Sequence, residues 1–513
     1  MSGPSQIGRR SLCETGDVTD TRQPEPRPGA GPFALTADEI AAATGGRLLH
    51  ASDRPVKGAA VDSRQVRPGE LFVALPGERT DGHTFLREAS AAGAAALLVQ
   101  ELPVGMADLA VEGGPAIVAV PDTLRGLHAV ASAWRGRFSP LVVGVTGSLA
   151  KTSTKEAIAT VLSERFVTLK NEGNANNEIG LPLTVLRMGP QHTAAVLEMG
   201  MYVGGEIAEL AAIARPRIGV VTAVREVHLS RIGTIEAIER AKGELIEALP
   251  RDGTAILNAD DFRVARMGAR TAARTLTYGF AAEADVSAED VVSAGLDGMR
   301  YTLVTPAGRV DATTPALGRH GVHNGLAAAA VGLAAGLDLD AIAAGLSLGW
   351  RAPHRDQIVR LADLTILDDS YNASPTSMIA ALELLSTLPG RHVAVLGEMR
   401  ELGGSHDRGH REVGEAAAGL ADLVVVVGEE ASGIAEGVIS GHGSVVRVPD
   451  RAAALQILRE RLEPGDVVLV KASRGVALEW IVESLVGSAS SPVSGSVAAG
   501  GSRPSREPSE EIS

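Results

Sequence analysis

The chain has 513 residues, 45% of them hydrophobic, which is enough for about three domains with buried cores. Its formal net charge of -14 argues against a nucleic-acid or anionic-membrane partner. A single cysteine, Cys13, excludes a disulfide framework and favours a reducing, cytoplasmic location. The sequence shows no pattern of a signal peptide and no apolar run of about 18 residues, so neither export nor a membrane span is expected.

Residues 1–32 are rich in Gly, Pro, Arg and Ser and predict a disordered tail. A capped helix follows, with Thr36 as N-cap and Glu39 three residues later. Strand and helix patterns then alternate in a small α/β unit with polar residues in or beside its loops. Ser63, Arg64 and His83 have the chemistry to hold a phosphate or a sugar there, although ordinary turn chemistry explains them equally well.

A strand, a Gly/Ser turn and a helix occupy residues 141 to about 165. This arrangement is typical of a phosphate-binding loop, in which backbone N–H groups and a helix N-terminus meet phosphate oxygens. Lys151 would reach the β- and γ-phosphates, and Thr152 would reach Mg²⁺. Ala150 and Val145 depart from the strict motif, so an ordinary βα turn is the alternative. The predicted loop residues are Gly147, Ser148, Leu149, Ala150, Lys151, Thr152 and Ser153.

The segment after this loop carries polar residues where an α/β sheet binds ligands. Residues 174–180 are dense in amides, and the buried strand 194–198 ends in Glu198. Because the carboxyl ends of parallel strands face the ligand crevice, Glu198 is placed to hold a metal near the phosphates; a solvated strand end is the alternative. His228 follows the next strand, and Lys242 lies on the helix after it. A lone histidine is usually structural, and His228 gains interest from its place in the same sheet.

The last part of the chain predicts another α/β domain. Residues 251–315 look mixed, with short strands, and an Ala-rich helix opens near Asn324, which would either cap that helix or face a base. After a boundary near residues 349–351, polar groups again follow the ends of buried strands, which is typical of a doubly wound domain. Residues 486–513 predict a second disordered tail. The strands of this domain are expected at 364–368, 392–396, 423–427 and 467–471.

Lysine is rare in this chain. Only six of its 48 basic residues are lysines, so arginine supplies positive charge wherever a generic cation suffices. A retained lysine is therefore a candidate for work that needs a compact ammonium or a deprotonable amine, although chance retention is the better explanation for Lys57 and Lys170. The six are Lys57, Lys151, Lys155, Lys170, Lys242 and Lys471.

Together these motifs resemble the ATP-dependent Mur ligases of peptidoglycan synthesis over about residues 35–485. The loop is similar to the family pattern GxTGSxGKTSTK, and the Glu198, His228 and Lys242 order is that of the family. The later motifs His323-Asn324, Pro353-His-Arg355 and Asp368 to Met378 also match. The resemblance implies a three-domain α/β architecture: a UDP-substrate-binding domain (33–138), a central P-loop ATPase-like parallel-sheet domain (139–348) and a C-terminal Rossmann-like ligase domain (349–485).

Within the family, the stretches 174–182, 371–378 and 395–403 are similar to the member that joins D-alanyl-D-alanine to UDP-MurNAc-tripeptide. The resemblance implies an acyl-phosphate intermediate and the products UDP-MurNAc-pentapeptide, ADP and phosphate. Together with the composition, it predicts a cytoplasmic protein without nucleic-acid partners. A monomer is expected, but the sequence leaves the oligomeric state open. The alternatives are another Mur-type amino-acid ligase, including a folylpolyglutamate synthase, and a non-catalytic nucleotide-binding paralogue with a degenerate loop. The third peptide residue, meso-diaminopimelate or lysine, stays open.

The resemblance also implies a role for each site residue. Two Mg²⁺ ions would be held by Thr152, Glu198, His228 and Lys242, the last as a carbamate formed with CO₂. The implied catalytic residues are Lys151, Lys242, His228 and Arg355. ATP would be bound by the loop together with Asn324 at adenine, Arg355 at the γ-phosphate, and Asp369 and Tyr371. The implied substrate-binding residues are Ser63, Arg64, Asn176 and Asn177.

Overall fold

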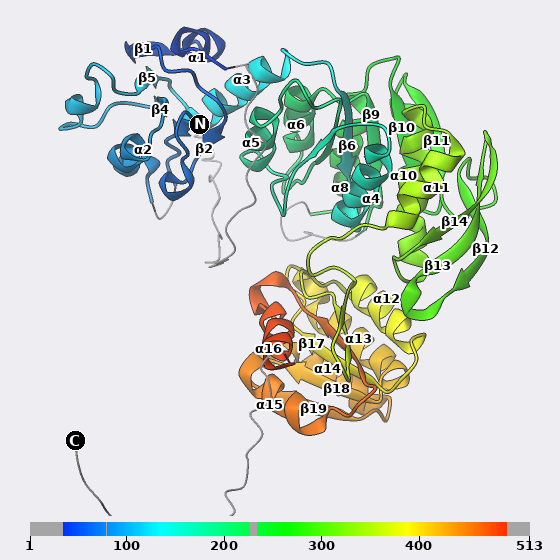
Figure 1. Cartoon of the computed structure of the whole chain (residues 1–513). Coiled ribbons are helices and arrows are strands. Elements are labelled where there is room, and N and C mark those ends of the chain that lie inside the picture. The colour runs from blue at the N-terminus through cyan, green and yellow to red at the C-terminus, as the bar shows by residue number, and fades with distance from the viewer. Residues whose placement is uncertain (1–33, 78–79, 226–232, 490–513) are drawn as a thin grey trace, which may run out of the picture.

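A computed structural model of the chain describes residues 34–77, 80–225 and 233–489. Three α/β units follow one another along the chain (Figure 1). The first lies beside the central unit, and the third lies on another side of the central unit. The three-domain α/β architecture predicted from the sequence is therefore present. The two predicted disordered tails lie largely outside the described residues, but helix α16 (Glu479–Ala489) continues beyond the boundary expected at residue 485.

The first unit is built on a five-stranded sheet in the order β1-β5-β4-β3-β2. Only β1 runs antiparallel to its neighbour, and the other pairs are parallel. The predicted capping box opens the first helix: Thr36 Oγ1 accepts from the Glu39 amide at 3.2 Å, and Glu39 Oε2 accepts from the Thr36 amide at 2.8 Å. The elements are α1 (Ala37–Thr44), β1 (Arg47–His50), β2 (Ala59–Ala60), β3 (Leu71–Val73), α2 (Leu86–Ala91), β4 (Ala96–Val99), β5 (Ala116–Ala119) and α3 (Thr123–Arg135).

The central unit contains a six-stranded parallel sheet in the order β11-β10-β9-β6-β8-β7. Its strands are β6 (Leu141–Thr146), β7 (Thr168–Lys170), β8 (Ala194–Glu198), β9 (Ile218–Val221), β10 (Thr254–Asn258) and β11 (Arg274–Tyr278). Strand β6 leads into the predicted phosphate loop and lies between β8 and β9. The carboxyl ends of these three strands therefore meet at one edge, as the sequence predicted.

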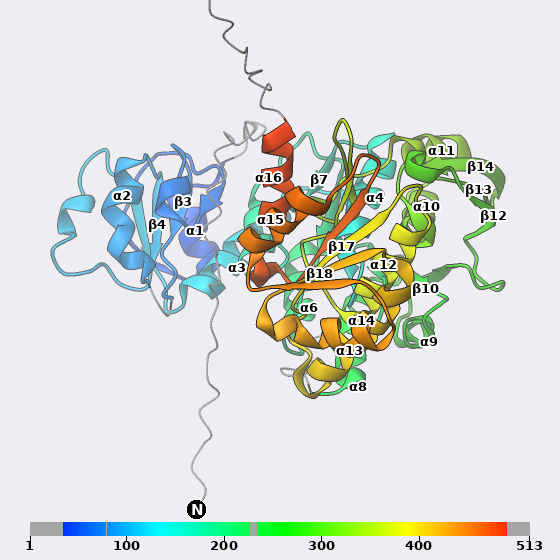
Figure 2. The same cartoon turned by 90° about the horizontal axis from the view of Figure 1, so that it is seen from below.

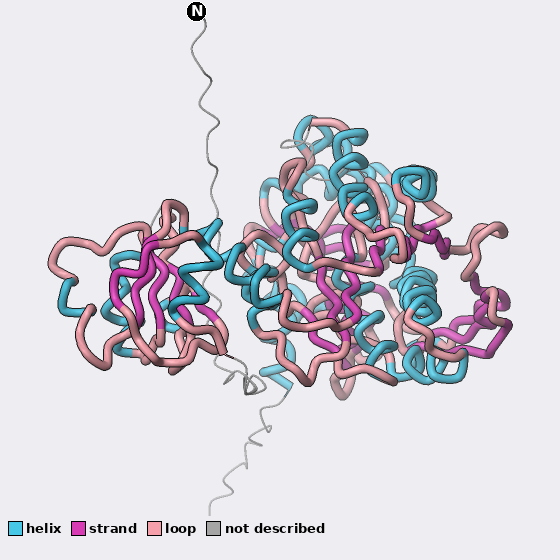
Figure 3. The backbone as a smooth tube through the Cα atoms, turned by 90° about the horizontal axis from the view of Figure 1, so that it is seen from above, coloured by secondary structure: helices cyan, strands magenta, loops and turns pink. Residues whose placement is uncertain are grey.

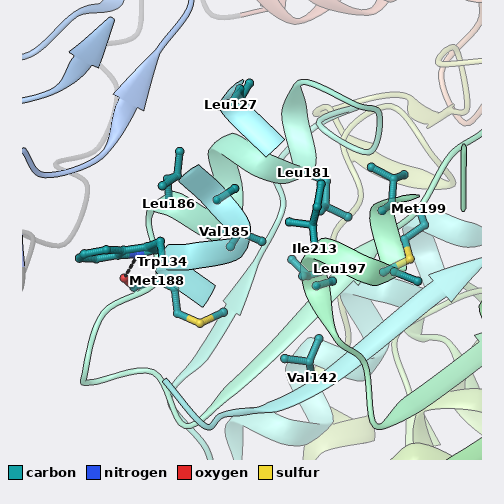
Figure 4. Close-up of a cluster of buried hydrophobic side chains, with 14 of the residues drawn as sticks. Leu127, Trp134, Val142, Leu181, Val185, Leu186, Met188, Leu197, Met199 and Ile213 are labelled. Atoms are coloured by element: carbon teal, nitrogen blue, oxygen red, sulfur yellow. Dashed lines mark hydrogen bonds between the residues drawn. The ribbon is translucent and has the colours of Figure 1, made fainter. Parts of the chain in front are cut away.

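Helices cover both faces of this sheet because its strands are apolar on both sides. The helices are α4 (Lys151–Ser163), α5 (Gly180–Leu186), α6 (Glu206–Ala214), α8 (Ile235–Glu247), α9 (Phe262–Ala265), α10 (Gly318–Ala334) and α11 (Leu339–Leu348). One core joins Val143 and Val145 to α4, α10 and α11. The other joins Val142 and Leu197 to α5, α6 and α8, and it includes Leu127 and Trp134 of α3 (Figure 4).

Helix α3 thus packs the first unit onto the central one. Trp134 Nε1 donates to the carbonyl of Met188 at 2.9 Å, which satisfies the one polar atom of this buried ring. The region predicted as mixed, residues 251–315, supplies β10 and β11 to the parallel sheet. Its later part forms a three-stranded antiparallel sheet of β12 (Ser287–Ser293), β13 (Met299–Thr305) and β14 (Gly308–Thr314). In the part of the chain that is described, no helix is long and apolar enough to cross a membrane.

The third unit has a six-stranded sheet in the order β15-β16-β20-β17-β18-β19, covered by helices (Figure 2). Helices also lie beside the strands of the first unit, as the view from above shows (Figure 3). Four of its strands match the predicted ones, whereas β15 and β19 were not predicted. Strand β15 is antiparallel to β16, and the other pairs are parallel. The elements are β15 (Gln357–Arg360), β16 (Thr365–Asp368), α12 (Pro375–Ser386), β17 (His392–Gly397), α13 (His406–Leu420), β18 (Leu423–Val427), α14 (Ser432–Ser440), β19 (Val445–Val448), α15 (Arg451–Arg461) and β20 (Val467–Lys471).

Candidate active site

The phosphate loop is packed tightly against the end of strand β9. Gly147 has φ of 152°, and a Cβ built on it would lie 1.9 Å from Thr222 Oγ1. The Ser148 amide donates to the carbonyl of Ala223 at 2.7 Å, and Thr222 Oγ1 donates to the carbonyl of Leu149 at 2.5 Å. The first loop position therefore accepts only glycine. Hydrogen bonds to Thr222 and Ala223, which follow strand β9, hold the loop in its conformation.

Ala150 occupies a left-handed conformation, with φ of 61° and ψ of 5°. It is the residue before Lys151, where α4 begins, and its carbonyl accepts the Thr154 amide at 2.8 Å. Because an L-residue with a Cβ pays about 1 kcal/mol or more in this region, the strict motif's glycine would relieve strain here. The departure noted in the sequence is thus a conformational cost that the surrounding loop contacts offset.

Glu198 is held by two side chains from different segments. Its Oε2 accepts from Thr152 Oγ1 at 2.8 Å, and its Oε1 accepts from Asn176 Nδ2 at 2.7 Å. The residue is only 2% exposed. A solvated strand end is therefore excluded, and three of the predicted site residues meet at the carboxyl ends of β6 and β8.

Two lysines line one cavity of about 110 Å³ beside this carboxylate. Burial lowers the pKa of Lys151, with Glu198 opposing the shift and Arg355 adding to it. Burial, together with the charge of Lys151, holds the pKa of Lys242 well below its usual value. Within the described ranges Lys242 has no hydrogen-bond partner, although it is 3% exposed. Burial disfavours the charged form of an amine in this environment, whereas an arginine would keep its charge.

The amide-rich segment contributes to the same cavity. Asn176 and Asn177 both line it, as do Glu178 and Tyr202. Asn177 also has a local task, because its Oδ1 accepts the Gly180 amide at 2.9 Å and fixes the start of α5. His228 belongs to the predicted site but lies outside the described residues.

The predicted residues of the first unit do not line this cavity. Ser63 Oγ donates to Glu88 Oε2 at 3.1 Å, and Arg64 forms an ion pair with Asp62 at 2.9 Å. His83 is fully engaged, since Nδ1 lies 2.7 Å from Asp81 Oδ1 and Nε2 accepts from the Gln100 amide at 2.8 Å. For His83 the turn-chemistry interpretation therefore holds.

Asn324 does not cap a helix. It lies inside α10, buried, and its Oδ1 accepts from Thr154 Oγ1 at 3.1 Å. Of the two alternatives left open for Asn324, the helix cap is excluded because α10 begins at Gly318, six residues earlier. The contact joins α10 to α4 directly behind the phosphate loop.

The third unit presents a cluster at the ends of β16 and β20. The guanidinium of Arg355 stacks 4.0 Å from the centre of the Tyr371 ring. Lys471 forms an ion pair with Asp369 and donates to the carbonyl of Asn372 at 3.0 Å. Burial raises the pKa of Asp369 to about 6, against the opposing effect of Lys471.

Three family models match the chain in order. The Mur ligase family catalytic domain matches residues 55–131, the Mur ligase middle domain matches 145–332, and the Mur ligase glutamate ligase domain matches 354–474. The UDP-N-acetylmuramoyl-tripeptide–D-alanyl-D-alanine ligase of Escherichia coli strain K12 is 38% identical over 447 residues, which cover 85% of this chain and 95% of the relative. The chain belongs to the Mur ligase family.

Solved structures agree with this assignment. MurF from Acinetobacter baumannii superposes with a TM-score of 0.80 and 30% identity, covering 89% of this Mur ligase and 99% of the neighbour. The MurF ligase of Thermotoga maritima, solved in complex with ADP, has a TM-score of 0.74 and 30% identity, and 85% of this chain and 98% of that chain are covered. The fold predicted from the resemblance is thereby confirmed.

Some residues of this Mur ligase's site were not assigned a role from sequence. The sequence marked Lys471 by the rarity of lysine, and it marked Lys471 and Arg474 as polar groups at a strand end. Asn171, which contacts the main chain of Glu198, had no signal apart from its amide-rich surroundings. Arg474 donates to the Tyr371 hydroxyl at 3.2 Å. No cluster of three or more His, Cys, Asp or Glu side chains suited to a metal occurs among the described residues. The Thr152 hydroxyl and the Glu198 carboxylate are two oxygen donors that meet at the loop.

Proposed function

We propose that this Mur ligase uses ATP to join D-alanyl-D-alanine to UDP-MurNAc-tripeptide, giving UDP-MurNAc-pentapeptide, ADP and phosphate. The observation that carries the proposal is the buried Thr152–Glu198 pair at the phosphate loop, in a chain that aligns with 95% of a relative named for this reaction. The cytoplasmic location expected from the sequence is part of the same proposal.

The chemistry begins with a carboxylate, which is a poor electrophile until its oxygen becomes a leaving group. The terminal carboxylate of the tripeptide attacks the γ-phosphorus of ATP, the bond to the β-phosphate oxygen breaks, and ADP leaves. The amine of D-alanyl-D-alanine then attacks the acyl carbon, phosphate leaves, and the amine loses a proton. Lys151 and the loop N–H groups hold the phosphoryl oxygens in place during the transfer.

Mg²⁺ fits the donors at this loop. The Thr152 hydroxyl and the Glu198 carboxylate are oxygen ligands of the type that Mg²⁺ prefers, and both are buried beside Lys151. When bound, the metal would neutralise negative charge on the phosphates. We include His228 as a further ligand on the family resemblance alone.

Lys242 is proposed to carry CO₂ as a carbamate. Burial and the charge of Lys151 lower the pKa of Lys242, which favours the neutral amine. The nitrogen lone pair of that amine would bond to the carbon of CO₂, and one N–H proton would be released. The resulting carboxylate would stand in the cavity that Lys151 lines. The negative charge of the carbamate would replace the electrostatic repulsion between Lys151 and a charged Lys242 with attraction.

The remaining roles follow the nucleotide and the substrate. Asn324 would meet adenine through its Nδ2 group, because Oδ1 is occupied by Thr154. The third-domain residues Arg355, Asp369 and Tyr371 would contact the nucleotide from the opposite side. The proposed substrate contacts are Ser63 and Arg64 for the UDP portion, and Asn176 and Asn177 for the peptide portion.

The test is a coupled assay of ADP release with UDP-MurNAc-tripeptide and D-alanyl-D-alanine, with the peptide product identified by mass spectrometry. Lys151→Ala should abolish turnover, whereas Lys57→Ala, at an exposed lysine of the first domain, should not. Paired substrates ending in meso-diaminopimelate or lysine would identify the third residue. Tight ATP binding without ADP release from the wild type would instead favour the non-catalytic paralogue.

A further inference from the structure

Asn171 pairs with the main chain of Glu198 as a neighbouring strand would. It directly follows strand β7, and the last backbone pair of β7 with β8 is Lys170 with Val196. Asn171 Oδ1 accepts from the Glu198 amide at 2.9 Å, and Nδ2 donates to the Glu198 carbonyl at 3.0 Å. The side chain therefore extends the ladder to the residue that carries the carboxylate.

The side-chain amide of Asn171 also hydrogen-bonds to the segment that contacts the Glu198 carboxylate. Asn171 Nδ2 donates to the carbonyl of Ala175 at 2.8 Å. The next residue, Asn176, donates to Glu198 Oε1 and accepts the Gly200 amide on its own carbonyl at 2.8 Å. One buried side chain, 2% exposed, thus fixes both the backbone of Glu198 and the loop that contacts its carboxylate.

Lys155 anchors Asn171 in turn. It is fully buried on α4, four residues after Lys151, and its Nζ donates to the Asn171 carbonyl at 2.6 Å. Its charge is balanced by Glu156 Oε1 at 2.9 Å. Burying an ammonium costs free energy unless it is paired and hydrogen-bonded, and both conditions are met here.

These contacts form a closed circuit. It runs from α4 through Lys155 to Asn171, from there to Glu198, and back to α4 through Thr152. We propose that Asn171, anchored by Lys155, is a positioning residue that fixes the Glu198 carboxylate relative to Thr152 for metal–nucleotide binding. The inference rests on the proposed function, because it assigns the pair a metal to hold.

Asn171→Asp is the sharpest variant because it keeps the size of the side chain. An oxygen would replace Nδ2 and face the carbonyls of Glu198 and Ala175, which repel it. Outer contacts of metal ligands typically contribute about 10- to 100-fold in metal affinity. We therefore expect Mn²⁺ binding in the presence of ADP, measured by electron paramagnetic resonance of the free ion, to weaken at least about tenfold.

A second pair of variants separates positioning from packing. The side chains of Lys155 and Lys170 both pair with Glu156, but of these two side chains, as the described residues show them, only that of Lys155 hydrogen-bonds to Asn171. Lys155→Met should weaken Mn²⁺ binding with ADP, whereas Lys170→Met should leave it unchanged. Asn171→Ser removes the contacts without adding charge, and it serves if the aspartate variant does not fold. Raised Mg²⁺ concentration should restore part of the turnover of Asn171→Ser.

The outcomes distinguish this inference from the function on which it rests. If folded Asn171→Ser and Lys155→Met proteins, with wild-type circular dichroism, bind Mn²⁺ and ADP as tightly as the wild type, Asn171 is merely structural and the inference is wrong. If the wild type binds no Mn²⁺ with ADP and releases no ADP from ATP, the proposed function fails instead.

Discussion

The hydroxyl of Thr152 donates a 2.8 Å hydrogen bond to Oε2 of Glu198, although 46 positions separate the two residues in the chain. The contact exists because β6 and β8 are adjacent and parallel, with Val145 registered opposite Glu198. The phosphate loop that follows one strand therefore meets the last residue of the other. This relationship places the Glu198 carboxylate beside the predicted phosphate loop.

Glu198→Gln should lower kcat by about 100-fold or more. The amide keeps the shape of the side chain but removes the negative charge that a metal needs, and metal ions contribute several kcal/mol to transition-state stabilisation. Steady-state ADP release at saturating substrates measures the effect. Glu164→Gln, at an exposed position just after α4, is the matched control and should retain wild-type kcat. Equal activity of the two variants would remove Glu198 from the mechanism.

Ala150→Gly should stabilise the protein. Because residue 150 has φ of 61°, the Cβ of alanine is a cost that glycine removes, and we expect the free energy of unfolding to rise by about 1 kcal/mol. The same substitution at Ala344, exposed within α11, should have the opposite sign and cost about 1 kcal/mol. Denaturant titrations compare them. Turnover of Ala150→Gly should stay close to that of the wild type, and a loss of stability would contradict the conformational argument.

The proposed carbamate on Lys242 requires CO₂, so turnover should depend on CO₂. An arginine at this position cannot form the carbamate, so Lys242→Arg should be inactive. Burial and the charge of Lys151 lower the pKa of Lys242, so the neutral amine that reacts with CO₂ becomes populated at lower pH than for an exposed lysine. With ¹³C-labelled bicarbonate, the wild type should show a carbamate resonance that Lys242→Arg lacks. Removing CO₂ from the buffer should lower turnover reversibly. A wild-type spectrum identical to that of Lys242→Arg would rule out the carbamate.

The contact between His320 and Asp356 should make stability depend on pH. His320 lies on α10 and Asp356 in the third unit; His320 Nε2 is 3.3 Å from Asp356 Oδ2, an ion-pair distance without hydrogen-bond alignment. Burial and the charge of Lys471 lower the pKa of His320, whereas the carboxylates of Asp356 and Asp369 raise it. The carboxylates have the larger combined effect, so the pKa of His320 is raised. Burial also acts against the Asp356 carboxylate, yet His320 brings the pKa of Asp356 down to about 2.

The sign follows from these directions. The His320 contribution is complete below its unfolded pKa of about 6.5 and is lost as pH rises through the higher folded value. The Asp356 contribution is complete above about pH 4 and is lost as pH falls toward 2. The difference in melting temperature between wild type and His320→Asn should therefore be largest at about pH 4–6.5 and shrink by about pH 9. A difference that grew with pH would contradict this assignment.

Several structural features of this protein could be predicted from its sequence because they depend on local interactions. The capping box at Thr36, the glycine at 147 and the strand ending in Glu198 each depend on residues close in the chain, so their patterns predict them directly. The rarity of lysine marked Lys242 and Lys471, and the structure places both in buried positions.

The tertiary structure decided which of these residues meet. The sequence could not show that Asn324 lies inside α10 and bonds to Thr154, or that Asn171 pairs with Glu198, because those contacts depend on how helices and strands far apart in the chain are placed. Nor could it show that Ser63 bonds to Glu88. The spacing of apolar residues predicts which face of a helix or strand is buried. Which residue packs against that face is decided only when helices and strands assemble in the tertiary structure.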